Sequence, residues 1–178
     1  MIARRSAALL ATVALVTALA ACAPAAAPKP SPTPTGFASK EEAFAAAEKT
    51  YRAYVDALNE VDLSDPATFE PVYALTTGDA RDSEKKGLSQ YHAAKLRVTG
   101  DTEITLLKGK SWQPGSGRAV LDACTDVSAV EVVNENGESQ VSPDRPDVQT
   151  LSVKLVYTPS DRVFKIENIG PREGGPAC

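Results

Sequence analysis

Residues 148–169, VQTLSVKLVYTPSDRVFKIENI, are the stretch that decides the fold. Apolar and polar residues alternate over 148–157, which is typical of a β-strand with one buried face. The Pro-Ser-Asp sequence at 159–161 predicts a turn, after which residues 163–169 return as a second apolar-rich strand. The buried face of the first strand is expected to carry Leu151, Val153, Leu155 and Tyr157. An antiparallel hairpin is therefore predicted near the end of the chain.

Two β-prone segments come before this hairpin. The first contains Val98, Ile104, Leu106 and Leu107. The second runs over 118–133 and alternates around Val120, Asp122, Cys124, Val127 and Val133, before a turn signal, Asn-Glu-Asn-Gly, at 134–137. Between them, the glycine-rich segment 109–117 is expected to be a loop, in which Trp112 either folds back onto the domain or anchors a partner.

The residues before the strands predict three helices. Ser39 and Glu42 form a capping box at the start of a helix over about 40–60. Its apolar residues recur at helical spacing and are Phe44, Ala47, Tyr51, Tyr54, Val55 and Leu58. Asp65 and Pro66 resemble the N-cap and first residue of a short second helix. A third helix is expected over about 78–95, with an inner face of Leu88, Tyr91, His92 and Leu96.

Helices that precede a run of antiparallel strands predict an α+β fold. We expect N-terminal helices packed on a curved antiparallel sheet of about four strands, in a single domain over residues 37–178. This length is sufficient for one hydrophobic core. Aromatic residues make up only 6% of the chain, so the core should depend mainly on Val, Leu, Ile and Ala.

Residues 1–21 have the features of a bacterial lipoprotein signal peptide. Arg4 and Arg5 precede an uncharged apolar run that is too short to span a membrane. The run ends in Leu19-Ala20-Ala21-Cys22, which resembles the lipobox. We expect cleavage before Cys22 and attachment of diacylglycerol and palmitate to it, which would hold the protein on the extracytoplasmic face of the cell membrane. The alternative is an ordinary secretory leader in which Cys22 is incidental.

The segment after Cys22 is expected to be a spacer. Residues 22–36 contain five prolines among Ala, Ser, Thr and Lys, a composition typical of an extended tether. The formal net charge is −4, and losing Arg4 and Arg5 with the leader would take it to −6. This balance argues against a nucleic-acid partner.

With Cys22 assigned to lipid, two cysteines remain. An even count in an oxidising compartment predicts a disulfide between Cys124 and Cys178. The bond would pin the Gly/Pro-rich C-terminal tail to the core. The alternative is a metal or redox pair, which the lack of a Cys-x-x-Cys motif and the single histidine do not favour.

The order of elements resembles the nuclear transport factor 2-like fold, also called the cystatin-like α+β cone. The chain also resembles small actinobacterial lipoproteins of that shape. The features that carry this resemblance are the lipobox, the tether, the helix around Tyr51, and the sequence 120–124 with the terminal Cys178. The resemblance covers about residues 37–178 and implies a curved sheet around a pocket closed by helices. Its members include isomerases, dehydratases and cyclases, together with non-catalytic modules.

Three side chains are candidates for lining such a pocket. His92 is the only histidine, a residue type that often serves as a general base, and Tyr91 lies beside it. Asp122 shares a strand face with Cys124 and would enter the pocket if that face did. The plainer interpretation places His92 on the surface or as a seal of the core, and Asp122 in a polar stripe.

The sequence contains no nucleophile elbow, phosphate-binding loop or metal-ligand cluster. We therefore expect no metal or cofactor and favour a non-catalytic binding or accessory module of the cell envelope, with an unidentified envelope protein or ligand as partner. One alternative is an isomerase- or dehydratase-like enzyme that uses the pocket, with His92 or Asp122 as base. Another is a surface-exposed protein that blocks phage adsorption.

Overall fold

A computed structural model describes residues 36–178 of the chain; the expected signal peptide, Cys22 and the tether up to residue 35 lie outside the described residues. The helices are α1 (Lys40–Asn59), the 3-10 turn η1 (Pro66–Phe69), α2 (Glu70–Leu75) and α3 (Gly78–Ala93). The strands are β1 (Arg97–Thr99), β2 (Glu103–Gln113), β3 (Arg118–Asp126), β4 (Glu131–Val133), β5 (Val148–Thr158) and β6 (Val163–Pro171).

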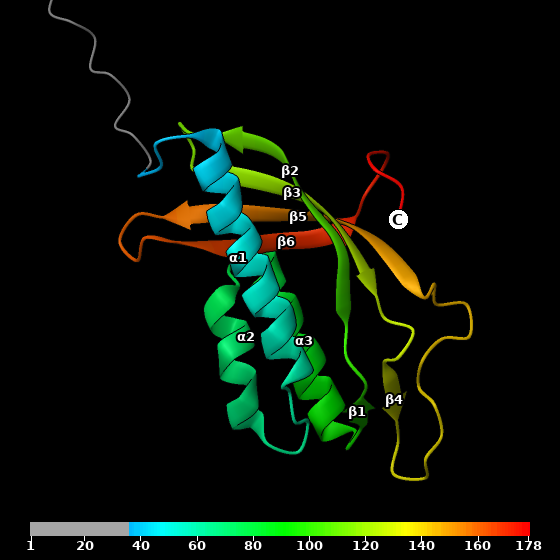
Figure 1. The fold of residues 1–178 in the computed structure, drawn as a ribbon. Coiled ribbons are helices and arrows are strands. Elements are labelled where there is room, and N and C mark those ends of the chain that lie inside the picture. The colour runs from blue at the N-terminus through cyan, green and yellow to red at the C-terminus, as the bar shows by residue number, and fades with distance from the viewer. Residues whose placement is uncertain (1–35) are drawn as a thin grey trace, which may run out of the picture. The chain divides into compact units, whose positions relative to one another are not determined.

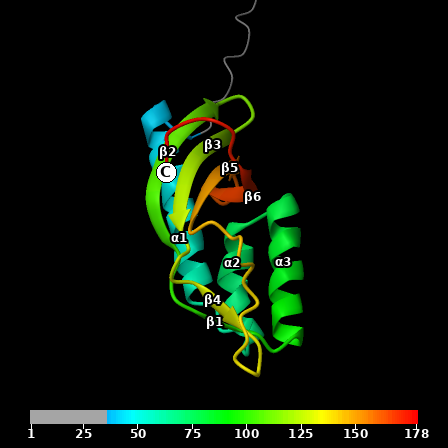
Figure 2. The ribbon, with the colours of Figure 1, turned by 90° about the vertical axis from the view of Figure 1, so that its right-hand side faces the viewer.

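The main sheet is an antiparallel meander in the order β2-β3-β5-β6, and the helices cover one of its faces (Figure 1). Helix α1 contacts β2, β3 and β6, while α3 lies beside β6. Strands β1 and β4 form a separate two-stranded sheet below the main one (Figure 2). This arrangement confirms the α+β fold of N-terminal helices on a four-stranded antiparallel sheet.

The helix starts follow from local capping. Ser39 Oγ accepts a hydrogen bond from the Glu42 backbone N–H at 3.1 Å, and Glu42 Oε2 accepts one from the Ala38 N–H at 2.6 Å. Asp65 caps η1 by accepting a hydrogen bond from the Ala67 N–H at 3.0 Å, and a proline follows it as predicted. These contacts satisfy donors that a helix cannot satisfy itself.

The hairpin at 148–169 is present, with Val153 and Leu155 fully buried. Opposite them across the sheet, β3 turns its odd-numbered residues Ala119, Leu121 and Ala123 toward the helices. Asp122 and Cys124 alternate with these residues and therefore lie on the other face of the sheet.

The expected strand segments are divided more finely than the sequence predicted. The first segment is split between β1 and β2, and the run 118–133 is split into β3 and β4. At the second break, the Asp126 carboxylate accepts a hydrogen bond from the Ser128 N–H at 2.9 Å, which closes a local turn. At the first break, Gly100 has a φ of +77° and so close an approach to Ala129 that a Cβ would lie 1.9 Å from its carbonyl oxygen.

The prediction that Trp112 occupies a loop is wrong, because Trp112 lies within β2. It does fold back onto the domain, where its ring contacts those of Phe37 and Phe164 with centroids 5.8 and 5.7 Å away. Tyr157 completes this aromatic cluster, at 4.8 Å from Phe37. One end of the core, next to the start of α1, is therefore filled.

Candidate ligand-binding cavity

A cavity of about 370 Å³ lies at the other end of α1. Its wall is contributed by the last turn of α1, the following loop, the middle of α3 and the β1–β4 sheet, which lie together at the base of the molecule (Figure 2). The lining residues are Leu58, Asn59, Val61, Leu63, Glu84, Gly87, Leu88, Tyr91, residues 98–102, Val130 and Val132.

The wall is held in place by a side-chain clamp. The Asn59 Nδ2–H donates to the Thr102 carbonyl at 3.1 Å, and the Thr102 N–H donates to Asn59 Oδ1 at 2.9 Å. This pair of bonds attaches the segment between β1 and β2 to the end of α1. The close backbone contact of Gly100 with Ala129 attaches the same segment to the β3–β4 connection.

Glu84 lies on the wall and is hydrogen-bonded by a phenol from the neighbouring helix. The buried Tyr54 hydroxyl of α1 donates to Glu84 Oε1. Burial raises the pKa of Glu84 above its ordinary value, although the Tyr54 hydrogen bond acts in the opposite direction. Burial also raises the pKa of Tyr54, and the neighbouring Glu84 charge raises it further. Tyr51 stacks beside Tyr54, and burial raises its pKa to about 12.

The ionisable lining of the cavity has one sign of charge. Glu84 and Asp101 are its carboxyls, and neither Lys, Arg nor His lines it. Among residues 36–178, no salt bridge includes either carboxyl. The remaining side chains are mainly Leu and Val, and the wall combines this hydrocarbon with nearly as much polar surface from carboxyl, hydroxyl, amide and backbone groups.

The structure brings one of the three sequence-predicted candidates to this cavity. Tyr91 is 43% exposed and lies at the cavity wall, so it is not part of an inner face that seals the core. His92 is exposed, and its Nδ1 lies 2.7 Å from the Leu63 carbonyl oxygen in a separate shallow depression that also contains Lys95 and Glu135. The placement of His92 in the pocket and on the inner face is therefore wrong. Tyr91 and His92 are successive residues of a helix, so their side chains point about 100° apart, and only Tyr91 lies at the cavity.

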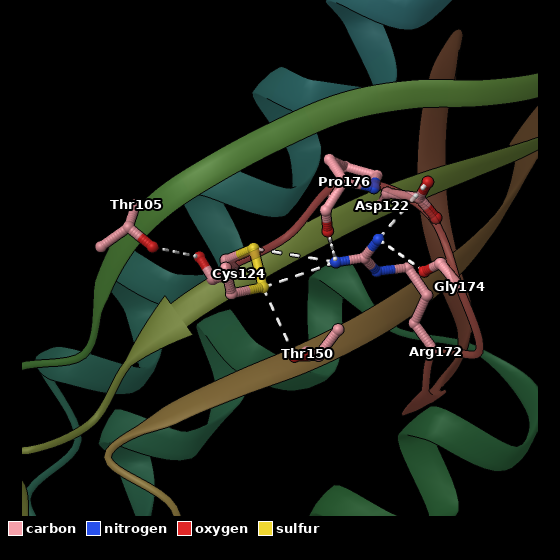
Figure 3. Close-up of a disulfide and its surroundings, with 8 residues drawn as sticks. Thr105, Asp122, Cys124, Thr150, Arg172, Gly174 and Pro176 are labelled. Atoms are coloured by element: carbon pink, nitrogen blue, oxygen red, sulfur yellow. Dashed lines mark hydrogen bonds and ion pairs between the residues drawn. A yellow bond between two sulfur atoms is a disulfide. The ribbon is translucent and has the colours of Figure 1, made fainter.

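Asp122 is also outside the cavity, on the sheet face turned away from the helices (Figure 3). Its carboxylate lies 3.5 Å from Lys110 Nζ and 3.9 Å from Arg172 Nη1. The expectation of a pocket base at this position is therefore wrong. The residues that face the helices are the odd-numbered ones of β3, a choice that the alternation in the sequence had left open.

The expected disulfide between Cys124 and Cys178 is present, and it fastens the C-terminal tail over Asp122 (Figure 3). The fully buried guanidinium of Arg172 organises this tail, donating to the carbonyls of Gly174 and Pro176 at 2.8 Å each. Arg172 Nη2 also lies 3.4 Å from Cys178 Sγ. The polar cluster around Asp122 therefore secures the tail and has no access to the cavity.

Sequence reasoning missed Tyr54 and Glu84 as site residues. A signal was present, because Ala80, Glu84 and Leu88 are spaced four apart and form one stripe of α3, in which Ala80 and Leu88 are buried. A carboxyl in a stripe that packs inward is a candidate for a functional group. Asp101 gave no comparable signal, since it lies in a short connection between strands.

Two further findings concern residues 36–178. No three His, Cys, Asp or Glu side chains there are placed to hold a metal ion. No helix in this part of the chain is long and apolar enough to cross a membrane.

No family model matches the chain, and no curated protein matches its sequence. Solved structures do match. A Novosphingobium aromaticivorans protein with a provisional assignment as an aromatic ring hydroxylase has a TM-score of 0.51 and 12% identity, over 74% of this chain and 88% of that one. The intermembrane space region of the chloroplast protein ARC6 has a TM-score of 0.49 and 14% identity, over 71% and 94%. A Methylobium petroleophilum PM1 protein of unknown function with a cystatin-like fold has a TM-score of 0.35 and 14% identity, over 76% and 83%.

At these identities the similarity shows the fold alone. The match with a TM-score above 0.5 agrees with the α+β architecture of N-terminal helices on a four-stranded antiparallel sheet, and the nuclear transport factor 2-like resemblance stays a prediction.

Proposed function

We propose that this protein is an exported lipoprotein, held on the extracytoplasmic face of the cell membrane through lipid on Cys22, whose α+β domain binds a small, largely apolar ligand. The observation that carries the binding function is the cavity at the end of α1. Its volume of about 370 Å³ lies within the range of small-molecule sites. Apolar walls with a few convergent polar groups are the usual composition of such sites.

The rim of the cavity adds support. Tyr91 and Val98 line it and are 43% and 36% exposed, so apolar surface continues from the interior to solvent. Large side chains exposed at the mouth of a hollow often contact a ligand.

The anchoring part of the proposal depends on the lipobox and the tether. A disulfide is typical of proteins outside the reducing cytosol, so the Cys124–Cys178 bond supports export. Two acyl chains of a diacylglycerol are sufficient for durable attachment.

Binding can be tested by filling the cavity. Gly87 lies on the wall, and a Cβ there would meet no atom within 4 Å. We expect the purified full chain to bind a neutral apolar fluorescent dye such as Nile red, and Gly87→Leu to lose this binding while remaining folded. Gly115→Leu is the matched control, because its Cβ also meets open space but lies in the turn after β2. Equal dye binding by both variants would refute the assignment of the cavity.

Anchoring can be tested by mass spectrometry of membrane fractions. The expected mature protein begins at a lipidated Cys22, and Cys22→Ser should move the protein from the membrane to the soluble fraction. An unmodified Cys22, or a mature N-terminus elsewhere, would contradict the anchor.

A second candidate function is an acid–base enzyme that uses Glu84. It is favoured by a carboxyl of raised pKa that is hydrogen-bonded to a buried phenol on a cavity wall. A carboxyl tuned toward neutral pH can exchange protons with a bound substrate. The test is proton exchange of an enolisable cyclic ketone in deuterated water, followed by NMR. The expected exchange is lost in Glu84→Gln, and equal exchange in both proteins would exclude this function.

A further inference from the structure

We infer that the ligand of the cavity carries a protonated amine on an apolar body, and that its ammonium group is recognised by Glu84 and Asp101. This inference rests on the proposed binding function and adds the chemical class of the ligand.

The cavity wall carries a carboxyl without a counter-charge from residues 36–178. Glu84 is half-buried, receives a hydrogen bond from the neutral Tyr54 hydroxyl, and has no basic partner among the described residues. A carboxylate that is removed from water without a counter-charge is in an unfavourable environment. A cation entering the cavity would supply the missing charge.

The other polar side chains of the wall are either hydrogen-bond acceptors or already engaged. The Asn59 amide is already engaged by the Thr102 backbone, so it is less available to a ligand. Asp101 adds a second acidic group, and the side chains of Thr99 and Tyr91 are hydroxyls, which can accept hydrogen bonds. The lining therefore offers acceptors and negative charge to a donor. It offers no basic side chain to an anion.

An organic cation fits this wall better than a metal ion does. A divalent ion needs several oxygen ligands, and no three His, Cys, Asp or Glu side chains among residues 36–178 are placed to hold one. Hydrocarbon makes up slightly more than half of the wall, and it favours a ligand that has a hydrocarbon body of its own. These apolar lining residues are Leu58, Val61, Leu63, Leu88, Val98, Val130 and Val132. An amphipathic amine satisfies both parts of the site.

The experiment compares three probes that share one aromatic body: phenethylammonium, phenethyl alcohol and phenylacetate. Each is titrated into the purified full chain, with binding measured by calorimetry and by chemical-shift changes. The expected order of affinity is ammonium, then alcohol, then carboxylate, with at least about a tenfold gap between the first two. Titration of Gly87→Leu with the same probes measures the binding that does not involve the cavity.

Two variants assign the preference to the carboxyl. Glu84→Gln retains an acceptor for the Tyr54 hydroxyl but loses the charge. In this variant, phenethylammonium should bind no more than about three times as tightly as phenethyl alcohol. Asp82→Asn removes the same charge from an exposed position on α3, and it should leave the ratio unchanged. If Glu84→Gln does not fold, Asp101→Asn tests the same preference at the second carboxyl, where a smaller fall is expected.

The outcomes separate this inference from the proposed function. Equal affinity for phenethylammonium and phenethyl alcohol, both lost in Gly87→Leu, would overturn the inference and leave the binding function intact. An ammonium preference that survives in both Glu84→Gln and Asp101→Asn would also overturn it. Failure of all three probes and of the apolar dye to bind would contradict the proposed function itself.

Discussion

Removal of the Cys124–Cys178 bond by Cys178→Ser should destabilise the domain strongly. The bond joins residues 54 positions apart, so it prevents the unfolded chain from sampling many conformations. In the chain-entropy treatment, a loop of this length corresponds to about 14 cal/mol/K, or about 4 kcal/mol at 25 °C. We therefore expect the free energy of unfolding to fall by about 4 kcal/mol, which is a large part of the stability of a typical domain.

Urea denaturation of the full chain can measure this loss. Trp112 is the only tryptophan and lies in the aromatic cluster at the start of α1, so its fluorescence reports unfolding of the core. The slope of the free energy against urea should increase, because an unfolded chain without the cross-link exposes more surface. Wild-type protein treated with a thiol reductant should show the same midpoint as the variant.

The native contacts of the tail should not change this result much. We expect Arg172 to keep its hydrogen bonds to the Gly174 and Pro176 carbonyls in the variant, because neither bond includes a cysteine atom. The predicted loss therefore comes from the unfolded state. A loss below about 1 kcal/mol with an unchanged slope would refute the reasoning, because it would show that the unfolded chain is not restricted by the bond.

Three further predictions concern Gly109, Gly87 and the half-buried Glu84. Gly109→Ala should cost about 1–3 kcal/mol in urea denaturation, because its Cβ would lie 2.3 Å from the ring of Phe44 on α1; a cost near zero would mean that this contact is loose. Gly87→Ala should instead stabilise the protein by about 1 kcal/mol and raise its Tm by roughly 2–5 °C, since the site is helical and open; a lower Tm would contradict this. Glu84 has a folded-state pKa above its ordinary value of 4.5, so the folded state binds more protons than the unfolded state between those two values. Wild-type stability should therefore fall relative to Glu84→Gln as the pH rises through this window, and a pH-independent difference in denaturation midpoints would show that burial does not penalise the charge.

Local signals in the sequence were sufficient to predict most of the fold. The capping box at Ser39, the Asp65 cap and the alternation over 148–157 each depend on residues close together in the chain, and each is present in the structure. The break between β1 and β2 was not predictable in the same way. There Gly100 approaches Ala129, a contact between residues about thirty positions apart.

The site was less predictable, because its residues are brought together only by tertiary packing. The β3 segment is buried on both faces, one by the helices and one by the C-terminal tail, so alternation alone could not decide where Asp122 points. His92 and Tyr91 are neighbours in sequence, yet they face different depressions. The spacing of Ala80, Glu84 and Leu88 could have pointed to Glu84, but its hydrogen bond from the Tyr54 hydroxyl depends on the packing of α1 against α3.

The length of α1 determines how far the cavity lies from Gly36, where the described part of the chain begins. The helix has 20 residues and is therefore about 30 Å long, with Phe37 and the aromatic cluster at its first turn and Asn59 on the cavity wall at its last. Gly36 and the cavity therefore lie at opposite ends of the domain. In a protein anchored as proposed, we expect changes in the length of the proposed tether to alter reach and to leave ligand affinity unchanged.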